Sequence, residues 1–428
     1  MKTMNGDFLN FLKKRGFISQ CTDEIALKKA LTKPVTGYIG FDCTSDSLHI
    51  GSLLPLMLLR FFQKHGHKPI ILLGGGTTLI GDPSGKDETR KFLSEDQILD
   101  NKKSLQNDFE KFISFDKSNK NKAIIVDNYQ WLSGLKLINF LRDIGSKFSV
   151  NKMLALESIK QRLSREQNLS FLEFNYSILQ AFDFLELFEN YNCLIQFGGS
   201  DQWGNIVSGI DLIRRLKNKN NVFGLTTPLL TTSDGKKMGK TATGAIWLSE
   251  KKLSVQNFWQ YWRNTLDQDV IKFLYLFTDI STEEIEKYKK FDGSELNKVK
   301  VMLANEVTKI CHGEEKSKSA EYEAKKILVN KDLDIESINN CTKKITVKNE
   351  KDLQISIKDA LVELKLCNSN GDAKRLLSQG AVKINNTHIR DKNATIQEKD
   401  FNKNYQDNKS YVVLYVGKKN YGIIELIS

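Results

Sequence analysis

The stretch TGYIGFDCTSDSLHIGSLLPLMLLRFFQK, residues 36–64, carries the signals that decide the fold. An apolar run of strand type over 37–41 ends in the polar segment 42–47, and a second apolar run follows with helical spacing. Pro55 has no amide hydrogen and is tolerated only in the first turn of a helix, so we expect this helix to begin near Gly51. The stretch therefore predicts a buried strand, a polar turn and a helix.

His49 and Gly51 would lie at the N-terminal end of that helix. Free amide hydrogens and the helix dipole attract phosphate at such an end. Gly51 lets an adenine or a ribose approach the backbone, and His49 can donate a hydrogen bond to an α-phosphate as charge builds there. A surface histidine at a helix start is the alternative interpretation of this segment alone.

A second segment, SDGKKMGKT over 233–241, is a glycine-containing basic loop. Lys237 and Lys240 are three residues apart and can bracket a pyrophosphate leaving group. Phosphoryl-type transfers depend mainly on positioning and electrostatic stabilisation, so lysines that close on phosphates are chemically reasonable. A solvated loop rich in Lys and Gly is again the alternative for this segment alone.

Apolar runs of strand type recur up to about residue 230, with helical periodicity between them. Continuous apolar strands that alternate with helices predict an α/β fold with a Rossmann-like parallel sheet covered on both faces. Ligands bind beyond the carboxyl ends of the strands in such sheets. The runs are 37–41, 69–73, 123–126 and 193–197, and the polar or glycine residues that follow them, expected to meet in one crevice, are Asp42, 74–76, 127–128 and 198–202.

Four further segments, in order along the chain, resemble those of bacterial tyrosyl-tRNA synthetases, which are class I aminoacyl-tRNA synthetases. They are GYIGFD at 37–42, LIGDPSGK at 79–86, FNYSILQAFD at 174–183 and GGSDQWGN at 198–205. In this comparison HIGS and KMGKT correspond to the two ATP signatures written HIGH and KMSKS. The resemblance extends over essentially the whole chain. It implies that tyrosine is activated on the α-phosphate of ATP and then passed to a ribose hydroxyl of tRNA(Tyr).

Tyr176, Gln180 and Asp183 are spaced i, i+4 and i+7 and share one face of a predicted helix. A polar stripe that faces solvent would have the same spacing, and a lined pocket is the other interpretation. The resemblance implies that Tyr38 and Asp183 hydrogen-bond the substrate phenol, so that phenylalanine would leave both groups unpaired. The other tyrosine-binding residues that it implies are Asp82, Tyr176 and Gln180 at the ammonium group and Gln202 near the carboxylate.

The resemblance also implies the ATP contacts. No residue forms a covalent intermediate, and catalysis rests on alignment and on charge stabilisation by His49 and the loop lysines. Ser52 stands where the signature has its second histidine, and its hydroxyl can still donate to ribose or phosphate. Asn128 matches a residue that engages pyrophosphate or supports the transition state. The implied catalytic set is His49, Ser52, Lys86, Arg90, Lys237, Lys240 and Thr241, and the implied ATP-binding set is Gly40, Asp42, His49, Gly51, Gly199, Asp201 and Lys240.

The rest of the chain predicts further domains. Helical periodicity continues over 246–330, and the C-terminal part resembles the S-four type of RNA-binding module. Its segment 372–386 predicts a basic helix, a glycine turn, a strand and an Asn-Asn hairpin turn. The expected domains are a class I catalytic domain at 1–245, a helical anticodon-side domain at 246–330, a linker at 331–352 and an α+β RNA-binding module at 353–428.

The bulk composition fits a nucleic-acid partner. A net charge of +12 favours a polyanionic partner, either nucleic acid or an anionic membrane, although a solvated lysine-rich surface gives the same number. Six scattered cysteines without a CxxC pair favour a reducing cytoplasm over a zinc site or a disulfide framework. The chain has no apolar run of 18 residues, and its first 15 residues do not resemble a secretory signal. ATP is expected as a substrate accompanied by Mg²⁺, with no resident metal or organic cofactor.

The resemblance implies a homodimer, with its interface around 140–150. A helix buried within one subunit would show the same apolar pattern. Two other functions stay open: the related tryptophanyl enzyme, and a synthetase-derived RNA-binding or splicing cofactor without catalysis. Tyr38 and Asp183 argue against the first, because a phenol needs that pair. The retained His49 and loop lysines argue against the second. The apolar residues at the expected interface are Phe140, Leu141, Ile144, Phe148 and Val150.

Overall fold

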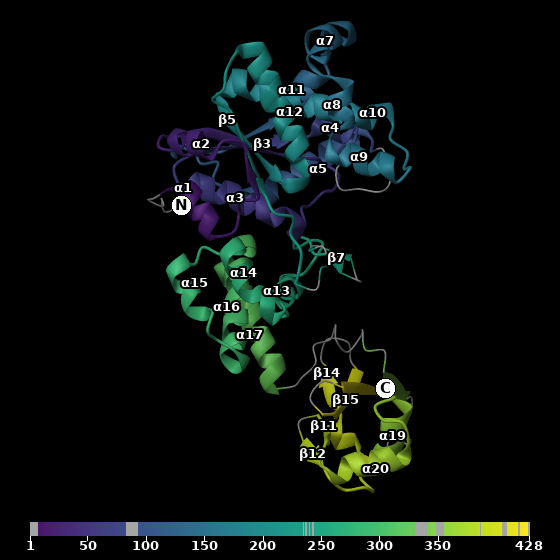
Figure 1. The fold of residues 1–428 in the computed structure, drawn as a ribbon. Helices are drawn as coiled ribbons and strands as arrows, with labels where there is room; N and C mark the ends of the chain where they lie inside the picture. The colour runs from purple at the N-terminus through teal and green to yellow at the C-terminus, as the bar shows by residue number, and fades with distance from the viewer. Residues whose placement is uncertain are drawn as a thin grey trace. The chain divides into compact units, whose positions relative to one another are not determined.

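The computed structural model describes residues 7–82, 93–233, 235, 238, 240–241, 244–330, 341, 343–347, 355–385, 387–404, 409–417 and 420–426. The chain divides into two compact units, Met1–Ala320 and Glu321–Ser428, and each is described by itself (Figure 1).

The first unit is built on a six-stranded sheet with the order β1-β6-β5-β2-β3-β4. The five strands from β6 to β4 are parallel, and β1 joins the edge antiparallel. This arrangement confirms the α/β class and the four predicted strands. Strand order reverses at β2, which lies between β3 and β5, and ligand crevices form at such switch points. The strands are β1 Gln20–Cys21, β2 Thr36–Phe41, β3 Lys68–Leu73, β4 Ile124–Asp127, β5 Cys193–Gly199 and β6 Phe223–Thr227.

Helices cover both faces of this sheet. Successive side chains of β2 point to opposite faces, so each face of the strand packs against a different helix. On one face, Tyr38 packs against Phe184 of α11 (Tyr176–Tyr191). The helix α12 (Trp203–Lys217) packs against α11 on the same face. Gly37 faces the other side, where a Cβ atom would lie 3.1 Å from Phe62 of α3 (Leu53–Lys64). The helix α3 follows a 3-10 turn, η1 (Ile50–Ser52), close to its predicted start.

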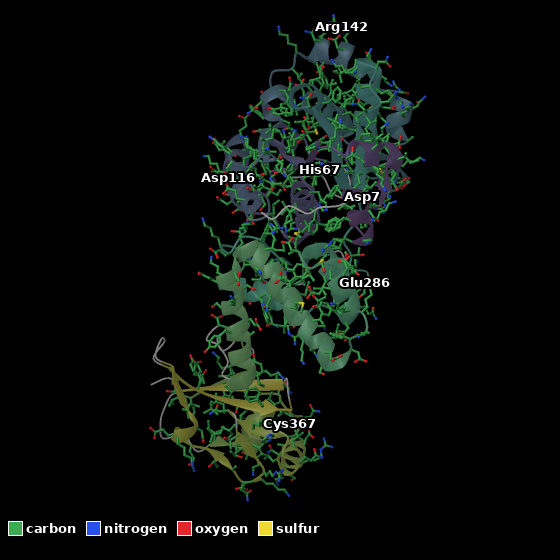
Figure 2. All side chains as sticks on the ribbon, turned by 90° about the vertical axis from the view of Figure 1, so that its left-hand side faces the viewer. Asp7, His67, Asp116, Arg142, Glu286 and Cys367 are labelled. Atoms are coloured by element: carbon green, nitrogen blue, oxygen red, sulfur yellow. The ribbon has the colours of Figure 1, made fainter. Side chains whose placement is uncertain are left out.

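The remaining elements of the first unit surround the sheet or form the helical region predicted over 246–330. Figure 2 shows Arg142 of α7 at the outer end of this unit and His67 within it. The elements are α1 Phe8–Lys14, α2 Glu24–Ala30, α4 Gly75–Thr78, α5 Glu95–Glu110, α6 Tyr129–Leu132, α7 Leu137–Asp143, η2 Gly145–Lys147, α8 Val150–Leu154, α9 Glu157–Ser164, α10 Phe171–Phe174, η3 Ser200–Gln202, β7 Lys240–Thr241, β8 Gly244–Ala245, α13 Val255–Arg263, α14 Asp267–Phe277, α15 Thr282–Tyr288 and α16 Gly293–His312. The helix α17 (Glu314–Asn330) begins in this unit and continues past its last residue, Ala320.

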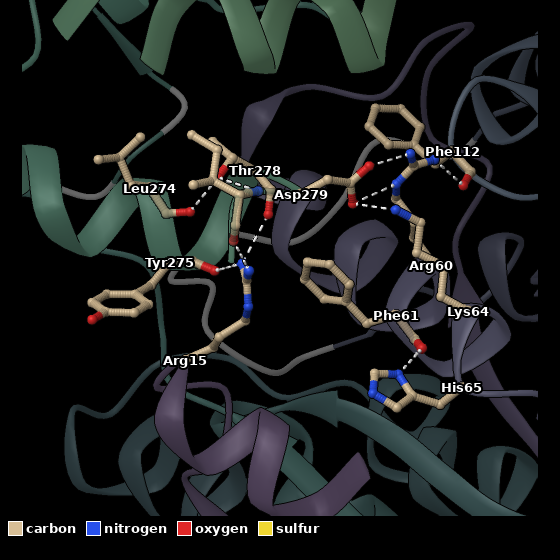
Figure 3. A network of polar contacts seen from close by, with 11 residues as sticks. Arg15, Arg60, Phe61, Lys64, His65, Phe112, Leu274, Tyr275, Thr278 and Asp279 are labelled. Atoms are coloured by element: carbon tan, nitrogen blue, oxygen red, sulfur yellow. Dashed lines mark hydrogen bonds and ion pairs between the residues drawn. The ribbon is translucent and has the colours of Figure 1, made fainter. Parts of the chain in front are cut away.

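A polar junction fixes this helical region to α3 (Figure 3). Arg60 and Lys64, near the end of α3, both bind the carboxylate of Asp279, each at 2.6 Å. Arg15 donates to the carbonyl oxygens of Tyr275 and Thr278 at 2.7 and 2.8 Å. Cations that satisfy carboxylate and carbonyl groups in this way offset the cost of burying them.

The second unit carries a sheet with the order β12-β11-β15-β16-β9, with β14 paired to β15. Two helices pack against it through a shared apolar core that includes Leu361, Leu377 and Val412. The elements are β9 Lys344–Val347, β10 Ile355–Ser356, α19 Ile357–Glu363, α20 Asn370–Ser378, β11 Val382–Ile384, β12 Thr387–Ile389, β13 Thr395–Ile396, η5 Glu398–Asp400, β14 Asn402–Asn404, β15 Lys409–Val416 and β16 Asn420–Leu426.

Two sequence expectations for this unit have different outcomes. The hairpin turn is confirmed, since β11 and β12 pair and Asn385 has a φ of 51°, although Asn386 lies outside the described residues. The linker expected over 331–352 is corrected at Lys344–Val347, which form β9 and pair parallel with β16. Ile345 and Val347 pack on the core, but two apolar residues at alternate positions are too short a pattern to predict a strand.

In the described part of the chain, none of the helices combines the length and the apolar character that a membrane crossing requires. All six cysteines are free thiols.

Candidate active site

A cavity of about 580 Å³ opens at the carboxyl ends of β2 and β5, at the switch point of the sheet. Segments that are far apart in the sequence meet there, as the polar residues after each strand predicted. The predicted site residues that line it are Tyr38, Gly40, Asp42, His49, Gly51, Ser52, Asp82, Tyr176, Gln180, Asp183, Gly199 and Gln202.

One end of the cavity is formed by Tyr38 and Asp183, whose exposed fractions are only 1% and 2%. The Tyr38 hydroxyl is buried and has no hydrogen-bond partner among the described residues. Burial, and then the nearby Asp183 charge, raise the pKa of Tyr38 well above its ordinary value. The hydroxyl therefore stays protonated and can donate one hydrogen bond and accept another.

Two donors hold the Asp183 carboxylate. Asn128 Nδ2 donates to one oxygen at 2.9 Å, and Trp131 Nε1 donates to the other at 2.8 Å. Burial raises the pKa of Asp183 to about 7, against the opposite effect of these two hydrogen bonds. Each carboxylate oxygen keeps a free lone pair, so the group can still accept a hydrogen bond from a ligand.

Asn128 is engaged on all sides. Its second amide hydrogen bonds Thr77 Oγ1 at 3.1 Å, and its Oδ1 accepts from the Gly76 amide at 2.8 Å. The side chain is 1% exposed and holds Asp183 and the turn after β3 rather than pointing out at a phosphate. Sequence reasoning missed Trp131. It lies three residues after Asn128, and that spacing is informative only once the short helix α6 is known.

Amide side chains form the middle of the cavity. Gln180 Nε2 donates to Gln202 Oε1 at 3.2 Å, and Gln202 Nε2 donates to Asp82 Oδ2 at 2.8 Å. Asn205, also missed from the sequence, donates to Gln180 Oε1 at 3.0 Å. These carboxylate and amide oxygens can receive an ammonium group, and the amide hydrogens can receive a carboxylate.

Tyr176 and Asp42 link this middle region to the end of β2. The Tyr176 hydroxyl donates to Asp42 Oδ1 at 3.3 Å, and Thr77 Oγ1 donates to the same oxygen at 3.2 Å. Tyr176, Gln180 and Asp183 all line the cavity from α11, so the stripe predicted on this helix faces a pocket and not solvent.

The other end of the cavity contains His49. Its Nδ1 accepts a hydrogen bond from the Gly51 amide at 2.9 Å, so the neutral ring carries its proton on Nε2 and can donate from there. A Cβ at position 51 would lie 2.5 Å from the His49 ring, which explains the glycine. The edge of Trp247 packs against the ring, with centroids 6.2 Å apart.

Main-chain pairing joins the HIGS segment to residues 246–248, which lie after the basic loop. The Ile50 amide donates to the Ile246 carbonyl and the Leu248 amide to the Leu48 carbonyl, both at 2.9 Å. His49 and Trp247 lie opposite each other in this bridge. Residues 246–248, five residues beyond the end of the basic loop, are therefore fixed beside the histidine.

Some predicted residues are not placed in the cavity. Lys86, Arg90 and Lys237 lie outside the described residues, as do the side chains of Lys240 and Thr241, whose backbone forms β7. Asp201 lines a neighbouring cavity instead of the one that contains His49. Its carboxylate lies close to Gly199, and Gly199 does line the His49 cavity.

Two family models match the chain. The model of tRNA synthetases class I (W and Y) matches residues 29–329. The model of the tyrosine–tRNA ligase SYY-like C-terminal domain matches residues 334–424.

Curated relatives match over their full length. The chain is 49% identical to the tyrosine–tRNA ligase of Pelagibacter ubique, covering 98% of this chain and 99% of that one. It is 48% identical to the tyrosine–tRNA ligase of Zymomonas mobilis, covering 99% and 100%. These relatives decide between the tyrosine and tryptophan branches of the class I model.

Solved structures agree with this. The C-terminally truncated mitochondrial tyrosyl-tRNA synthetase of Aspergillus nidulans is 28% identical with a TM-score of 0.66, covering 76% of this chain and 94% of that one. Its counterpart from Coccidioides posadasii is 29% identical with a TM-score of 0.63, covering 74% and 92%.

Proposed function

The chain belongs to the class I tyrosine–tRNA ligases, and on this premise we propose that its cavity holds tyrosine at the Tyr38–Asp183 end and ATP at the His49 end. A ligase of this family joins tyrosine to tRNA with ATP as the energy source. The proposal concerns which residues perform each step.

The unpaired Tyr38 hydroxyl carries the assignment of the tyrosine end. A substrate phenol can donate to the Asp183 carboxylate and accept from Tyr38, which satisfies all three groups together. Asn128 and Trp131 fix the carboxylate for that contact. Phenylalanine would leave the Tyr38 hydroxyl buried without a partner and would offer no hydrogen bond to Asp183, and an unsatisfied buried polar group costs about 1–3 kcal/mol.

Calorimetric titration with three amino acids tests this assignment. L-tyrosine should bind most tightly and L-phenylalanine should show no measurable binding. O-methyl-L-tyrosine can accept from Tyr38 but cannot donate to Asp183, so it should bind more weakly than tyrosine. Phenylalanine binding with an affinity similar to that of tyrosine would contradict the assignment.

At the middle of the cavity, Asp82, Tyr176 and Gln180 would hold the ammonium group, and Gln202 would lie near the carboxylate. The amide network that links Gln180, Gln202 and Asp82 supports this arrangement, because it presents acceptors and donors on one wall. The tyrosine carboxylate would then attack the α-phosphate of ATP and release pyrophosphate.

At the ATP end, the His49 Nε2 proton would stabilise the charge that develops at the α-phosphate. Gly40, Asp42, Gly51, Ser52 and Gly199 line this part of the cavity and would surround the nucleotide, with Asp201 near the ribose. Lys86, Arg90, Lys237, Lys240 and Thr241 would engage the pyrophosphate. Mg²⁺ would arrive bound to ATP, since the ion usually keeps phosphate and water ligands.

The C-terminal module would bind tRNA(Tyr), and the helical region 246–330 would lie on the anticodon side. Residues 353–428 contain 12 Lys and Arg against 8 Asp and Glu, which suits contacts with phosphates. On this account the boundaries 1–245, 246–330 and 353–428 remain those of three functional domains. Filter binding of tRNA(Tyr) should weaken steeply as salt rises.

The enzyme would act as a homodimer. Leu137 and Ile138 on α7 directly precede the segment expected at the interface and are 66 and 73% exposed, and Phe171 on α10 is 81% exposed. Of the five apolar residues expected there, Leu141 and Val150 are exposed, whereas Ile144 is buried and Phe140 and Phe148 pack on the unit's own core. An exposed apolar set of this kind fits a second copy of the chain.

Light scattering tests the dimer. Phe171→Glu should shift the mass from dimer to monomer, because a charge would be buried at the interface. Ile25→Glu is the matched control, since Ile25 on α2 is 86% exposed and lies outside the proposed interface. A monomeric wild type would contradict the proposal.

We also infer a cytoplasmic location. Six free thiols, four of them buried, fit a reducing compartment. Cell fractionation should recover the protein with cytosolic markers.

A further inference from the structure

The entry of the basic loop 233–241 is tied to the helical region by one buried carboxylate. Asp269 Oδ2 accepts hydrogen bonds from the Ser233 amide at 2.9 Å and from the Ser233 hydroxyl at 3.0 Å. Ser233 is the first residue of the loop, whereas Asp269 lies 36 residues further on, in α14, and is 2% exposed.

Asp269 lies in the first turn of its helix. It is the third residue of α14, where the helix dipole stabilises negative charge. Burying a carboxylate is costly unless hydrogen bonds satisfy it. Among the residues that the structure describes, the two hydrogen bonds to the Asp269 carboxylate both come from Ser233. The carboxylate therefore recognises one residue of the loop.

Neighbouring contacts hold the same end of the loop. Lys272, one turn further along α14, donates to the Thr231 carbonyl at 2.8 Å. The Gly235 amide donates to the Thr232 carbonyl at 2.9 Å, in a turn where Gly235 has a φ of +80°. Met238 is buried, and its amide donates to the Leu230 carbonyl at 3.1 Å.

The loop thus starts and ends at two fixed points. Its start is bonded to α14 through Ser233, and the residues that follow it pair with the His49 segment.

We propose that Asp269 is a positioning residue for adenylate formation, which acts through Ser233 to place the lysines of the loop at the pyrophosphate of ATP. The proposal rests on the function proposed above for Lys237 and Lys240. Asp269 touches neither substrate. Its loss should slow the chemical step and leave tyrosine binding unchanged, because the Tyr38–Asp183 end belongs to other elements.

Single-turnover formation of tyrosyl-adenylate tests the proposal, together with the dissociation constant of tyrosine. Asp269→Asn replaces one carboxylate oxygen with an NH₂ group and removes the negative charge, so the two hydrogen bonds from Ser233 should weaken. The rate should then fall about 10- to 100-fold, as expected for a small misplacement of catalytic groups. Ser233→Ala removes only the hydroxyl bond and should have a smaller effect in the same direction. Ser233→Thr keeps the hydroxyl and should retain the wild-type rate.

Asp279→Asn is the matched control. It breaks the ion pairs that join the same helical region to α3 but does not contact the loop. A similar loss of rate in Asp279→Asn would mean that Asp269 acts only by docking the helical region, and would overturn the proposal. An unchanged rate in Asp269→Asn would overturn it as well.

Lys240→Ala separates this proposal from the proposed function. If Lys240→Ala keeps the wild-type rate, the function assigned to the loop lysine fails. If Lys240→Ala is slow and Asp269→Asn is not, only the positioning role fails. The double variant should lose less than the product of the two single losses, because both changes affect Lys240, whereas Lys237 depends on Asp269 alone.

Discussion

Replacing Tyr38 with phenylalanine should change stability and activity in opposite directions. The hydroxyl is buried with no partner among the residues that the structure describes, and an unsatisfied buried polar group costs about 1–3 kcal/mol. Removing it should therefore raise the free energy of unfolding by about 1 kcal/mol or more.

The same substitution removes one hydrogen bond to the substrate phenol. A neutral hydrogen bond contributes about 0.5–1.5 kcal/mol, so kcat/KM for tyrosine should fall by roughly 2- to 10-fold. Phenylalanine should lose nothing, because it makes no bond to the hydroxyl. Selectivity for tyrosine over phenylalanine should therefore narrow by at least the same factor.

Urea denaturation and pyrophosphate exchange measure the two effects on one preparation. Tyr191→Phe is the control, because Tyr191 ends α11 away from the lining of the cavity. A Tyr38→Phe protein that is less stable than wild type, or that keeps the full selectivity for tyrosine, would refute the reasoning.

Three further predictions concern the same cavity. His49→Ala removes a donor to the α-phosphate and should lower kcat of exchange by about 10²- to 10³-fold with little change in the KM for tyrosine; a large change in that KM instead would contradict the role. Burial raises the pKa of Asp183 to about 7, so kcat/KM for tyrosine should fall as pH drops below about 7. Trp131→Phe should move this inflection to higher pH, because it removes a hydrogen bond that stabilises the ionised carboxylate. An inflection that does not respond to Trp131→Phe would point to another group. The folded, ligand-free protein binds more protons at Asp183 than the unfolded chain between about pH 4 and 7, so this group should make it less stable as pH rises through that window, and urea denaturation at several pH values should show a weaker pH dependence in Asp183→Asn.

Local sequence patterns predicted the fold well because burial is encoded along each element. Continuous apolar runs gave the parallel strands, and the spacing of Tyr176, Gln180 and Asp183 placed them on one face of α11. The short strand β9 was missed because its two alternate apolar residues carry too little signal.

Partners that meet only through the tertiary fold could not be predicted in this way. Trp131 and Asn205 support residues that were identified, but nothing in their own segments indicates which side chain they contact. The bond from Ser233 to Asp269 crosses 36 residues of chain. Asn128 was expected to engage pyrophosphate or to support the transition state, and its bond to Asp183 could not be predicted because the two residues are 55 positions apart.

Amino-acid-dependent ATP–pyrophosphate exchange, measured without tRNA, tests most directly the claim that Tyr38 and Asp183 recognise a phenol at a class I activation site. The account predicts exchange with tyrosine and none with phenylalanine or tryptophan at the same concentration. Exchange with tryptophan or phenylalanine at a rate close to that with tyrosine would contradict it.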